Sequence, residues 1–241
     1  DVYKRQDIKD QNVLEIGPGI GTITYEMAKI AKKVVAIEID QTLIPILKEN
    51  LSEFENAKVI KQDILKTDLK GLVDNEFNGE SFKVVSNLPY YITTPIIEML
   101  ITTGLPCDDM TIMVQKEVAE RMVASESDKE YSSLSVFIKF YTEAKVIANL
   151  PKSVFIPQPK IDSTILNLKL RIYDENVNQD LLFKLIRAGF NKRRKTILNS
   201  MSDVVEKDKL KEAFAKVDLK ENLRAENLSI DDFINLTNEL S

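Results

Sequence analysis

The stretch Asn12-Val-Leu-Glu-Ile-Gly-Pro-Gly-Ile-Gly-Thr22 decides the fold class, because an apolar run leads directly into three closely spaced glycines. Ile23, Met27 and Ile30 follow at helical spacing, so the segment predicts a strand, a glycine turn and a helix. Further strand-like runs at 33–38, 58–63, 82–86 and 109–114 alternate with helical segments. This alternation predicts an α/β fold with a doubly wound parallel sheet that helices cover on both faces.

The rest of the chain predicts two more strands and a helical end. Helical segments at 116–123 and 133–141 precede strand-like runs at 144–149 and 163–170, which we expect to close the sheet as an antiparallel pair. A loop with three prolines, 151–160, joins these two runs, since proline interrupts both helices and strands. We therefore expect a sheet domain over 1–172 and a small all-α domain over 173–241. The acidic, glycine-bearing stretch 67–81 is expected to be a surface loop.

Two absences narrow the chemistry. The 241 residues contain no histidine and one cysteine, Cys107. This composition excludes Ser-His-Asp and Cys-His catalysis, His-ligated metals and disulfide frameworks, so no metal is expected. The single cysteine and the lack of any apolar run of about 18 residues are typical of a cytoplasmic protein without membrane contact. A net charge of −5 by itself argues against a nucleic-acid binder.

The candidate ligand site follows from the strand ends. In a doubly wound sheet, ligands bind beyond the carboxyl ends of the strands. There, Glu38 is placed to accept hydrogen bonds from two ribose hydroxyls, and Asp63 to accept one from an adenine amine. The spacing G-P-G-x-G differs from the dinucleotide fingerprint, and with the glutamate before it resembles the E-x-G-x-G-x-G of S-adenosylmethionine-dependent methyltransferases. The resemblance predicts S-adenosylmethionine as cofactor and these cofactor-binding residues: Glu15, Gly17, Gly19, Gly21, Glu38, Asp63 and Asn87.

The run Asn87-Leu-Pro-Tyr90 carries the candidate chemistry. The Asn87 side-chain oxygen and the Leu88 carbonyl can accept hydrogen bonds from an exocyclic amine as its nitrogen becomes tetrahedral. Pro89 fixes the turn, and Tyr90 offers a ring on which an extruded base can stack. The run resembles the (D/N)-P-P-Y motif of amino-group methyltransferases, a reaction that needs no general base before transfer. Cys107 follows a proline, as the nucleophile of cytosine-C5 methyltransferases does, but its place before the fifth strand gives it no role.

Together with four other motifs, these segments resemble the KsgA (RsmA) family of ribosomal RNA adenine dimethyltransferases. The other motifs are Val35–Asp40, Gln62-Asp63, Val114–Met122 and Phe155–Ser163. The resemblance implies a Rossmann-like class I sheet and the transfer of two methyl groups to N6 of each of two adjacent adenines. These adenines lie in the hairpin near the 3′ end of small-subunit ribosomal RNA. The expected partner is therefore this RNA or its precursor particle, and the protein is expected to be a monomer.

The resemblance also assigns Phe155 as a second aromatic residue against the target base and the helical domain as an aid in gripping RNA. Members usually begin with a Q-N-F-L-like segment, which the opening residues 1–6 do not match, so we expect a truncated N-terminus. A cluster of basic residues in the helical domain, with two lysines of the proline-rich loop, predicts contacts to phosphate. These residues are Lys184, Arg187, Lys192, Arg193, Arg194 and Lys195, together with Lys152 and Lys160.

Three alternatives stay open. An Erm-type enzyme dimethylates one adenine of large-subunit RNA, but usually shows Asn-Ile-Pro-Tyr and a more basic chain, so Leu88 and the net charge disfavour it. A non-catalytic relative in ribosome assembly or transcription is disfavoured by the intact run from Asn87 to Tyr90. A nicotinamide-dependent oxidoreductase is disfavoured by the glycine spacing and by the lack of a proton-relay residue after the fourth strand.

Overall fold

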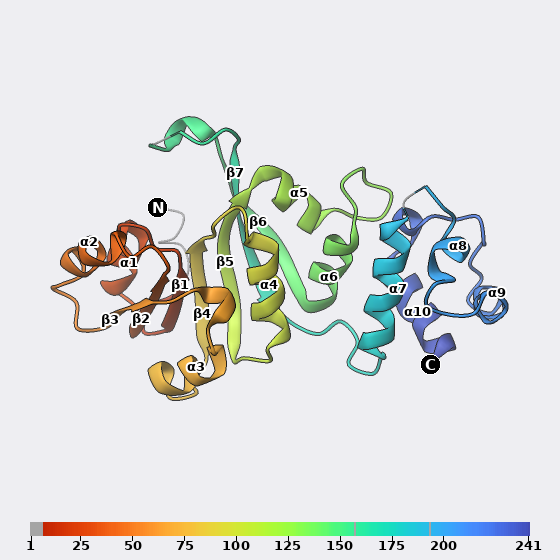
Figure 1. Ribbon diagram of the computed structural model, residues 1–241, viewed down its shortest axis with the longest axis horizontal. Coiled ribbons are helices and arrows are strands. Elements are labelled where there is room, and N and C mark those ends of the chain that lie inside the picture. The colour runs from red at the N-terminus through yellow and green to blue at the C-terminus, as the bar shows by residue number, and fades with distance from the viewer. Residues whose placement is uncertain (1–6, 157, 193) are drawn as a thin grey trace. The chain divides into compact units, whose positions relative to one another are not determined.

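A computed structural model describes residues 7–156, 158–192 and 194–241 (Figure 1). By its internal contacts the chain divides into two compact units. The first, which we call the sheet unit, runs to Ala119 and also contains Lys145–Leu170. The second, which we call the helical unit, comprises Glu120–Ala144 and Arg171–Ser241. The chain therefore crosses from one unit to the other more than once.

A seven-stranded sheet has the order β3-β2-β1-β4-β5-β7-β6. The first five strands in the chain pair in parallel, as the alternation of strands and helices predicts, and β7 runs antiparallel to β5. The strand β1 is buried along its whole length and β2 from Val34 onward, which matches the apolar residues that make up most of both strands. The bounds of the strands are β1 Asn12–Ile16, β2 Lys33–Glu38, β3 Ala57–Lys61, β4 Phe82–Asn87, β5 Cys107–Gln115, β6 Thr142–Leu150 and β7 Ser163–Leu170.

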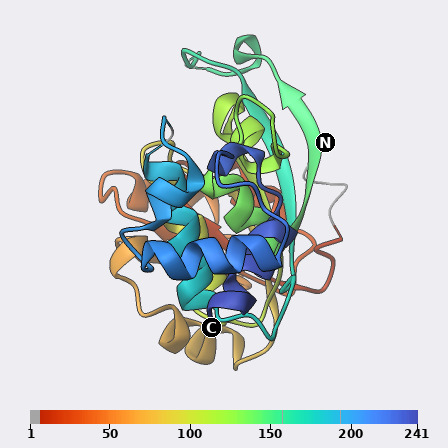
Figure 2. The ribbon, with the colours of Figure 1, turned by 90° about the vertical axis from the view of Figure 1, so that its right-hand side faces the viewer.

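The strands β6 and β7 lie side by side, and the loop that joins them extends from one end of this pair (Figure 2). The register of β7 on β5 begins at the pair Gln115 and Ser163 and continues to Asp109 and Lys169. Because Gln115 is the last residue of β5, this loop emerges at the carboxyl edge of the parallel strands. The runs at 144–149 and 163–170 were expected to pair with each other, and β6 and β7 are indeed neighbours in the sheet, while β7 also pairs antiparallel with β5.

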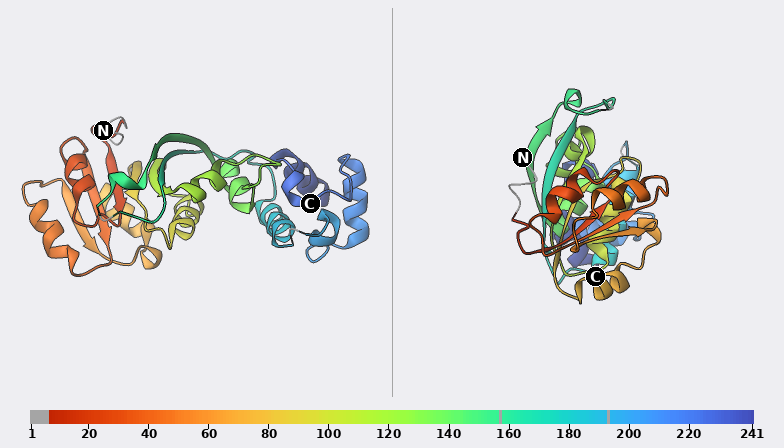
Figure 3. Two further views of the ribbon diagram at one scale, coloured as in Figure 1. Left: turned by 90° about the horizontal axis from the view of Figure 1, so that it is seen from above. Right: turned by 90° about the vertical axis from the view of Figure 1, so that its left-hand side faces the viewer.

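Helices connect the parallel strands and lie against the sheet (Figure 3). They are α1 Thr22–Ala28, α2 Leu43–Asn50, α3 Leu69–Phe77 and α4 Thr93–Thr102. One buried cluster joins Met27 and Ala28 of α1 to Val13, Val34 and Val85 of the three central strands. Side chains alternate along a strand, so Glu15 lies on the same face of β1 as Val13, the face that α1 covers. The fold thus buries a carboxyl group beneath the first helix.

The helix α3 contradicts the expectation of a surface loop at 67–81. The Asp68 carboxylate accepts a hydrogen bond from the Gly71 amide at 3.1 Å and caps the helix. Four apolar side chains on one stripe are buried, namely Leu69, Leu72, Val73 and Phe77. The helix ends at Asn78, which adopts the left-handed conformation. The loop prediction was wrong because it weighed glycine and acidic residues over this periodic stripe.

The helical unit contains α6 Ser133–Tyr141, α7 Gln179–Asn191, α8 Ile197–Met201, α9 Lys207–Lys216 and α10 Ile230–Leu240. The helix α5, Lys116–Val123, leads into it from the sheet unit. A common core includes Phe140, Leu185, Phe214 and Phe233, which come from four different helices. The segment 120–144 was expected to belong to the sheet domain, whereas its contacts lie with the C-terminal helices.

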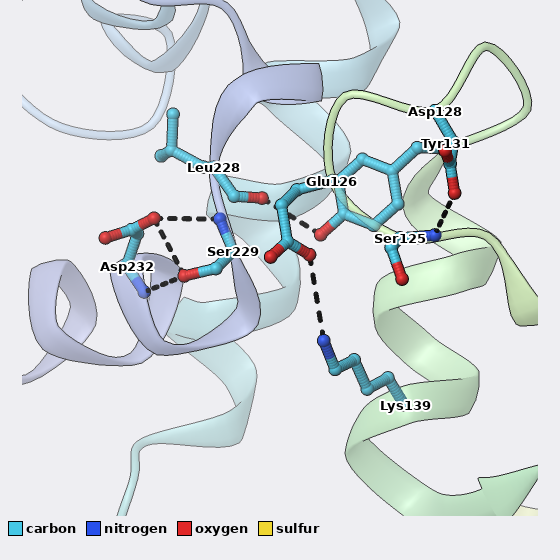
Figure 4. Close-up of polar contacts among 8 residues, drawn as sticks. All are labelled: Ser125, Glu126, Asp128, Tyr131, Lys139, Leu228, Ser229 and Asp232. Carbon is cyan, nitrogen blue, oxygen red and sulfur yellow. Dashed lines mark hydrogen bonds and ion pairs between the residues drawn. The ribbon is translucent and has the colours of Figure 1, made fainter.

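Polar contacts reinforce this assignment (Figure 4). The Tyr131 hydroxyl donates to the Leu228 carbonyl at 2.9 Å, and the Tyr131 ring packs edge-on against Phe190. Within the early segment itself, Lys139 pairs with Glu126 at 3.8 Å. The turn before α10 is fixed by a capping box in which Ser229 and Asp232 exchange hydrogen bonds. The early and late helical segments therefore form one packed body.

Helix length also bears on membrane contact. The helices within the described ranges reach at most the 13 residues of α7. A membrane-spanning helix needs about 20 apolar residues. None of the described helices is long and apolar enough to cross a bilayer.

Candidate functional site

The glycine turn after β1 has three residues with positive φ. Gly17, Gly19 and Gly21 have φ of 68°, 62° and 88°. A Cβ atom on Gly21 would lie 2.5 Å from Cδ1 of Leu47, and one on Gly17 would lie 3.3 Å from Cγ of Pro89. A Cβ on Gly19 would meet nothing within 4 Å. The turn is therefore packed at both ends and open at its centre, where a ligand can approach the backbone closely.

The Glu38 carboxylate holds this turn from the neighbouring strand. It is buried, and its Oε1 accepts hydrogen bonds from the amides of Ile39 and Asp40 at 2.8 and 2.9 Å. Its Oε2 accepts one from the amide of Gly19 at 3.2 Å. A carboxylate has about four acceptor sites, so these three bonds leave one for a ligand. To accept hydrogen bonds from two ribose hydroxyls, as the sequence predicts, Glu38 would have to lose its hydrogen bond to one of these amides.

A cavity of about 180 Å³ lies beyond the carboxyl ends of β1, β2 and β3. Four of the predicted cofactor residues line it, namely Gly17, Gly19, Glu38 and Asp63. Asp63 caps the short 3-10 helix η2, Ile64–Lys66, where its Oδ1 accepts from the Leu65 amide at 3.1 Å. Lys66 lies 3.6 Å from its other oxygen. The carboxylate is thus oriented by its own helix start.

The cavity walls include apolar residues that the sequence patterns did not single out. Each of them directly follows a predicted site residue or lies within two positions of one. Such adjacency is the only signal that could have found them. These wall residues are Ile16, Ile37, Ile39, Ile64, Tyr91 and Ile92, and Pro89 of the predicted catalytic run also lines the cavity.

The other three predicted cofactor residues, Glu15, Gly21 and Asn87, do not line this cavity. Glu15 is buried beneath the turn, where the Thr24 hydroxyl of α1 donates to its Oε2 at 2.5 Å. Burial raises the pKa of Glu15 to about 8, the Thr24 bond lowers it, and the negative charge of Glu38 raises it further. Glu15 is therefore mostly protonated near neutral pH, and its visible contact is with the first turn of α1.

The run Asn87 to Tyr90 is held from several sides. The buried Leu88 donates its amide to the Met113 carbonyl of β5 at 3.2 Å. The Pro89 carbonyl accepts from the Ile92 amide and the Thr93 hydroxyl, each at 3.1 Å, at the start of α4. Asn87, the last residue of β4, is exposed. The run is thus a fixed turn with its asparagine open to solvent, beside the glycine turn that Pro89 contacts.

Phe155 lies in the loop that joins β6 and β7, after the 3-10 helix η3, Lys152–Val154. It is half-buried and does not line the cavity. Lys152 and Lys160 are exposed on the same loop. The register of Gln115 with Ser163 places the loop at the carboxyl edge, which is the edge on which Asn87 ends its strand.

The basic residues of the helical unit are divided between α7 and the turn that follows it. Lys184 and Arg187 are exposed on α7. Arg194 and Lys195 line a surface hollow of about 660 Å³, together with Phe190, Asn191 and Lys192. Lys192 forms an ion pair with Asp203, an acidic residue that follows the basic cluster in the chain. Arg193 lies outside the described residues.

The remaining candidates for chemistry are excluded by position. Cys107 is buried at the amino end of β5, the edge opposite the cavity. Burial raises the pKa of its thiol to about 12, with Asp109 and Asp108 adding to the effect, so the thiolate needed for nucleophilic attack is scarce. Across the described ranges, no group of three or more histidine, cysteine, aspartate or glutamate residues could hold a metal ion.

Comparison with known proteins gives one consistent family. The family model described as ribosomal RNA adenine dimethylase matches residues 2–241. A protein of Clostridioides difficile named ribosomal RNA small subunit methyltransferase A is 47% identical over 235 residues, which cover 95% of this chain and 81% of that protein. A protein of the same name from Alkaliphilus metalliredigens is 44% identical over 249 residues, covering 100% of this chain and 86% of the relative.

Solved structures agree with this result. The crystal structure of a dimethyladenosine transferase from Plasmodium falciparum matches with a TM-score of 0.85 and 28% identity, covering 99% of this chain and 93% of that one. The 23S rRNA methyltransferase ErmE matches with a TM-score of 0.75 at 23% identity, over 99% of this chain and 95% of that one, which shows a shared fold. By its sequence and its fold, the chain belongs to the ribosomal RNA adenine dimethylase family.

Proposed function

We propose that this protein uses S-adenosylmethionine to dimethylate N6 of two adjacent adenines in the 3′-terminal hairpin of small-subunit ribosomal RNA. One observation carries the proposal. The Asn87–Tyr90 run packs directly against the glycine turn, through Pro89 and Gly17, at the mouth of a cavity that contains Glu38 and Asp63. A nucleoside-binding pocket and a pair of acceptors for an amine thus share one edge of the sheet. The names of the curated relatives support the small subunit as the source of the RNA.

The described residues fit the proposed cofactor. Glu38 keeps one acceptor site for a ribose hydroxyl, and Asp63 offers a carboxylate beside the apolar walls formed by Ile39 and Ile64. Gly19 leaves open space above the turn, into which a ligand can come close to the backbone. When bound, S-adenosylmethionine supplies an electrophilic methyl group. Gly17 completes the proposed binding set within the cavity. Glu15 and Gly21 contribute from outside it by supporting the turn, and Asn87 is proposed to reach the cofactor from the end of β4.

The catalytic role falls to Asn87, Leu88, Pro89 and Tyr90. The side-chain oxygen of Asn87 and the main-chain carbonyl of Leu88 accept hydrogen bonds from the two N–H groups of the adenine amine, which directs the lone pair of its nitrogen at the methyl group. Pro89 fixes the turn, and the Tyr90 ring stacks on the extruded base, with Phe155 as the second aromatic contact. The methylated nitrogen then releases its proton to water, so the reaction needs no histidine.

Phosphate contacts come from exposed cations on both units. Lys184, Arg187, Arg194 and Lys195 belong to the helical unit, and Lys152 and Lys160 to the proline-rich loop. Lys192 is engaged by Asp203 and must exchange that partner to reach a phosphate. In this proposal residues 1–172 form the catalytic domain and 173–241 the RNA-binding domain, with 120–144 packed onto the latter. The protein acts as a monomer in the cytoplasm, on a precursor of the small ribosomal subunit.

The test is a methylation assay with small-subunit particles that lack the modification. The protein is incubated with these particles and with labelled S-adenosylmethionine, and the modified adenines are mapped. Two adjacent dimethylated adenines in the 3′-terminal hairpin are expected. Label on large-subunit RNA would favour the Erm-type alternative. Cofactor binding without any transfer would favour a non-catalytic assembly factor, and either result would overturn the proposal.

A further inference from the structure

One hydrogen bond joins the catalytic run to a distant strand. The Tyr90 hydroxyl lies 2.9 Å from the hydroxyl of Ser163, the first residue of β7. Ser163 has no exposed surface, and its main chain pairs with Gln115 at the end of β5. A buried hydroxyl on a paired strand is a rigid anchor, because neither its backbone nor its side chain has room to move. The orientation of the Tyr90 ring is thus tied to the start of β7.

Asp162, the residue before Ser163, anchors the proline-rich loop. The Asp162 carbonyl accepts a hydrogen bond from the Lys116 amide at 3.0 Å, and its carboxylate accepts one from the Lys152 amide at 2.9 Å. The Lys152 carbonyl in turn accepts from the Phe155 amide at 3.3 Å. The turn that carries Phe155 is therefore held by hydrogen bonds to Asp162, just as Tyr90 is held by its hydrogen bond to Ser163.

We propose that Asp162 and Ser163 are positioning residues that set Tyr90 and Phe155 relative to each other and so define the slot for the target adenine. Neither residue touches the base, and both act through the aromatic side chains. The inference rests on the proposed function, because it needs a base between these two rings. It goes beyond that function by naming the part of the fold that fixes the spacing of the rings.

The expected size of the effect follows from the Tyr90 bond. A hydrogen bond of this kind contributes up to about 1.5 kcal/mol, which corresponds to roughly a tenfold change in rate if the bond is needed only to orient the ring. Loss of the Ser163 hydroxyl and loss of the Tyr90 hydroxyl break the same bond. The two changes should therefore not add, as interacting partners show in a double-mutant cycle.

The experiment compares Ser163→Ala, Tyr90→Phe and the double variant with the wild type. Each single variant should lower kcat by about tenfold, and the double variant should stay near tenfold rather than a hundredfold. The dissociation constant for S-adenosylmethionine should stay within about twofold, since Tyr90 and Ser163 do not line the cofactor cavity. A hundredfold loss in the double variant would overturn the proposal.

Thr164 provides a matched control. It is the next residue of β7, it is buried, and its hydroxyl donates to the Asn149 side chain at 2.8 Å, away from the catalytic run. Thr164→Val removes that bond and should lower the melting temperature while kcat stays within about twofold of the wild type. A fall in kcat equal to that of Ser163→Ala would show a purely structural effect and refute the positioning role.

Asp162 is tested by rescue. Asp162→Ala removes the acceptor for the Lys152 amide and should raise KM for the RNA several-fold. Asp162→Asn keeps an oxygen that can accept this hydrogen bond, so its KM for the RNA should equal that of the wild type. Equal KM values for the wild type and Asp162→Ala would overturn this part.

The outcome is separable from that of the proposed function. If the wild type fails to methylate the RNA, the proposed function fails by itself. The four proteins of the Tyr90 and Ser163 cycle are also compared by melting temperature, which needs no substrate. Non-additive losses in melting temperature are expected, and additive losses would refute the anchoring bond.

Discussion

Replacing Glu15 by glutamine should remove a large part of the pH dependence of the unfolding free energy. Burial raises the pKa of Glu15 from 4.5 to about 8 in the folded protein. Between these values the folded chain keeps a proton that the unfolded chain releases. The unfolded state therefore binds fewer protons, and stability falls as the pH rises. The contribution is fully present below pH 4.5 and is lost as the pH passes through about 8.

The magnitude follows from the gap between the two pKa values. Each pH unit within the gap costs about 1.4 kcal/mol of unfolding free energy, so the loss at pH 7 is about 3 kcal/mol. Glu15 is fully buried, so solvent does not screen this effect. A typical domain has only about 5–15 kcal/mol of stability, and the effect is therefore measurable. Glutamine keeps an oxygen that can accept from Thr24 but cannot ionise.

The assay is urea unfolding followed by circular dichroism at several pH values between about 5 and 8, the range in which the folded chain keeps the Glu15 proton and the unfolded chain releases it. The difference in unfolding free energy between the Glu15→Gln variant and the wild type should shift in favour of the variant by about 2.5 kcal/mol from pH 5 to pH 7. Glu49→Gln, on the exposed side of α2, is the matched control and should follow the wild type within about 0.5 kcal/mol. Parallel curves for Glu15→Gln and the wild type would refute the reasoning.

Three further changes test other parts of the site. Asn87→Ala should abolish methyl transfer and leave the affinity for S-adenosylmethionine within about tenfold by calorimetry, because Asn87 accepts hydrogen bonds from the substrate amine; equal losses in both would make it a binding residue. Gly21→Ala should lower the unfolding free energy by roughly 1–3 kcal/mol in urea titrations, since φ is 88° and the new Cβ would lie 2.5 Å from Leu47. Joint replacement of Arg194 and Lys195 by alanine should reduce the salt dependence of RNA binding, measured by fluorescence anisotropy. The slope of log binding constant against log salt concentration should fall by about 0.7 for each phosphate that the variant no longer neutralises. An unchanged slope would exclude both residues from binding phosphate.

The sequence predicts the parallel strands and the glycine turn well, because both follow from local patterns. It misses α3, whose signals conflict. Gly71 favours a loop, yet a Cβ at this position would lie 2.5 Å from Oδ2 of Asp68, the residue that caps the helix. The glycine thus makes room for the cap. Such a helix start becomes recognisable only when the cap and the buried stripe of Leu69, Leu72 and Val73 are considered together.

Within the candidate site, the positions at strand ends could be predicted and the contacts could not. Glu38 and Asp63 line the cavity because parallel strands bring their carboxyl ends to one edge. Glu15 lies on the opposite side of the turn, since its burial depends on where α1 packs. The bond between Tyr90 and Ser163 joins residues 73 positions apart, and no local pattern encodes it. Long-range packing therefore decides which of the predicted polar residues face a ligand.

Two separate physical reasons favour a glycine at position 17, and the sequence motif indicates only one of them. Its spacing with Gly19 indicates a ligand-binding turn, and its φ of 68° fits that interpretation. Yet the nearest obstacle to a side chain at this position is Pro89, at 3.3 Å from the Cβ it lacks. The position would thus favour glycine even if no ligand bound, because the Asn87–Tyr90 run packs there. The turn that approaches the cofactor and the run that approaches the base therefore share one contact, and neither can shift without displacing the other.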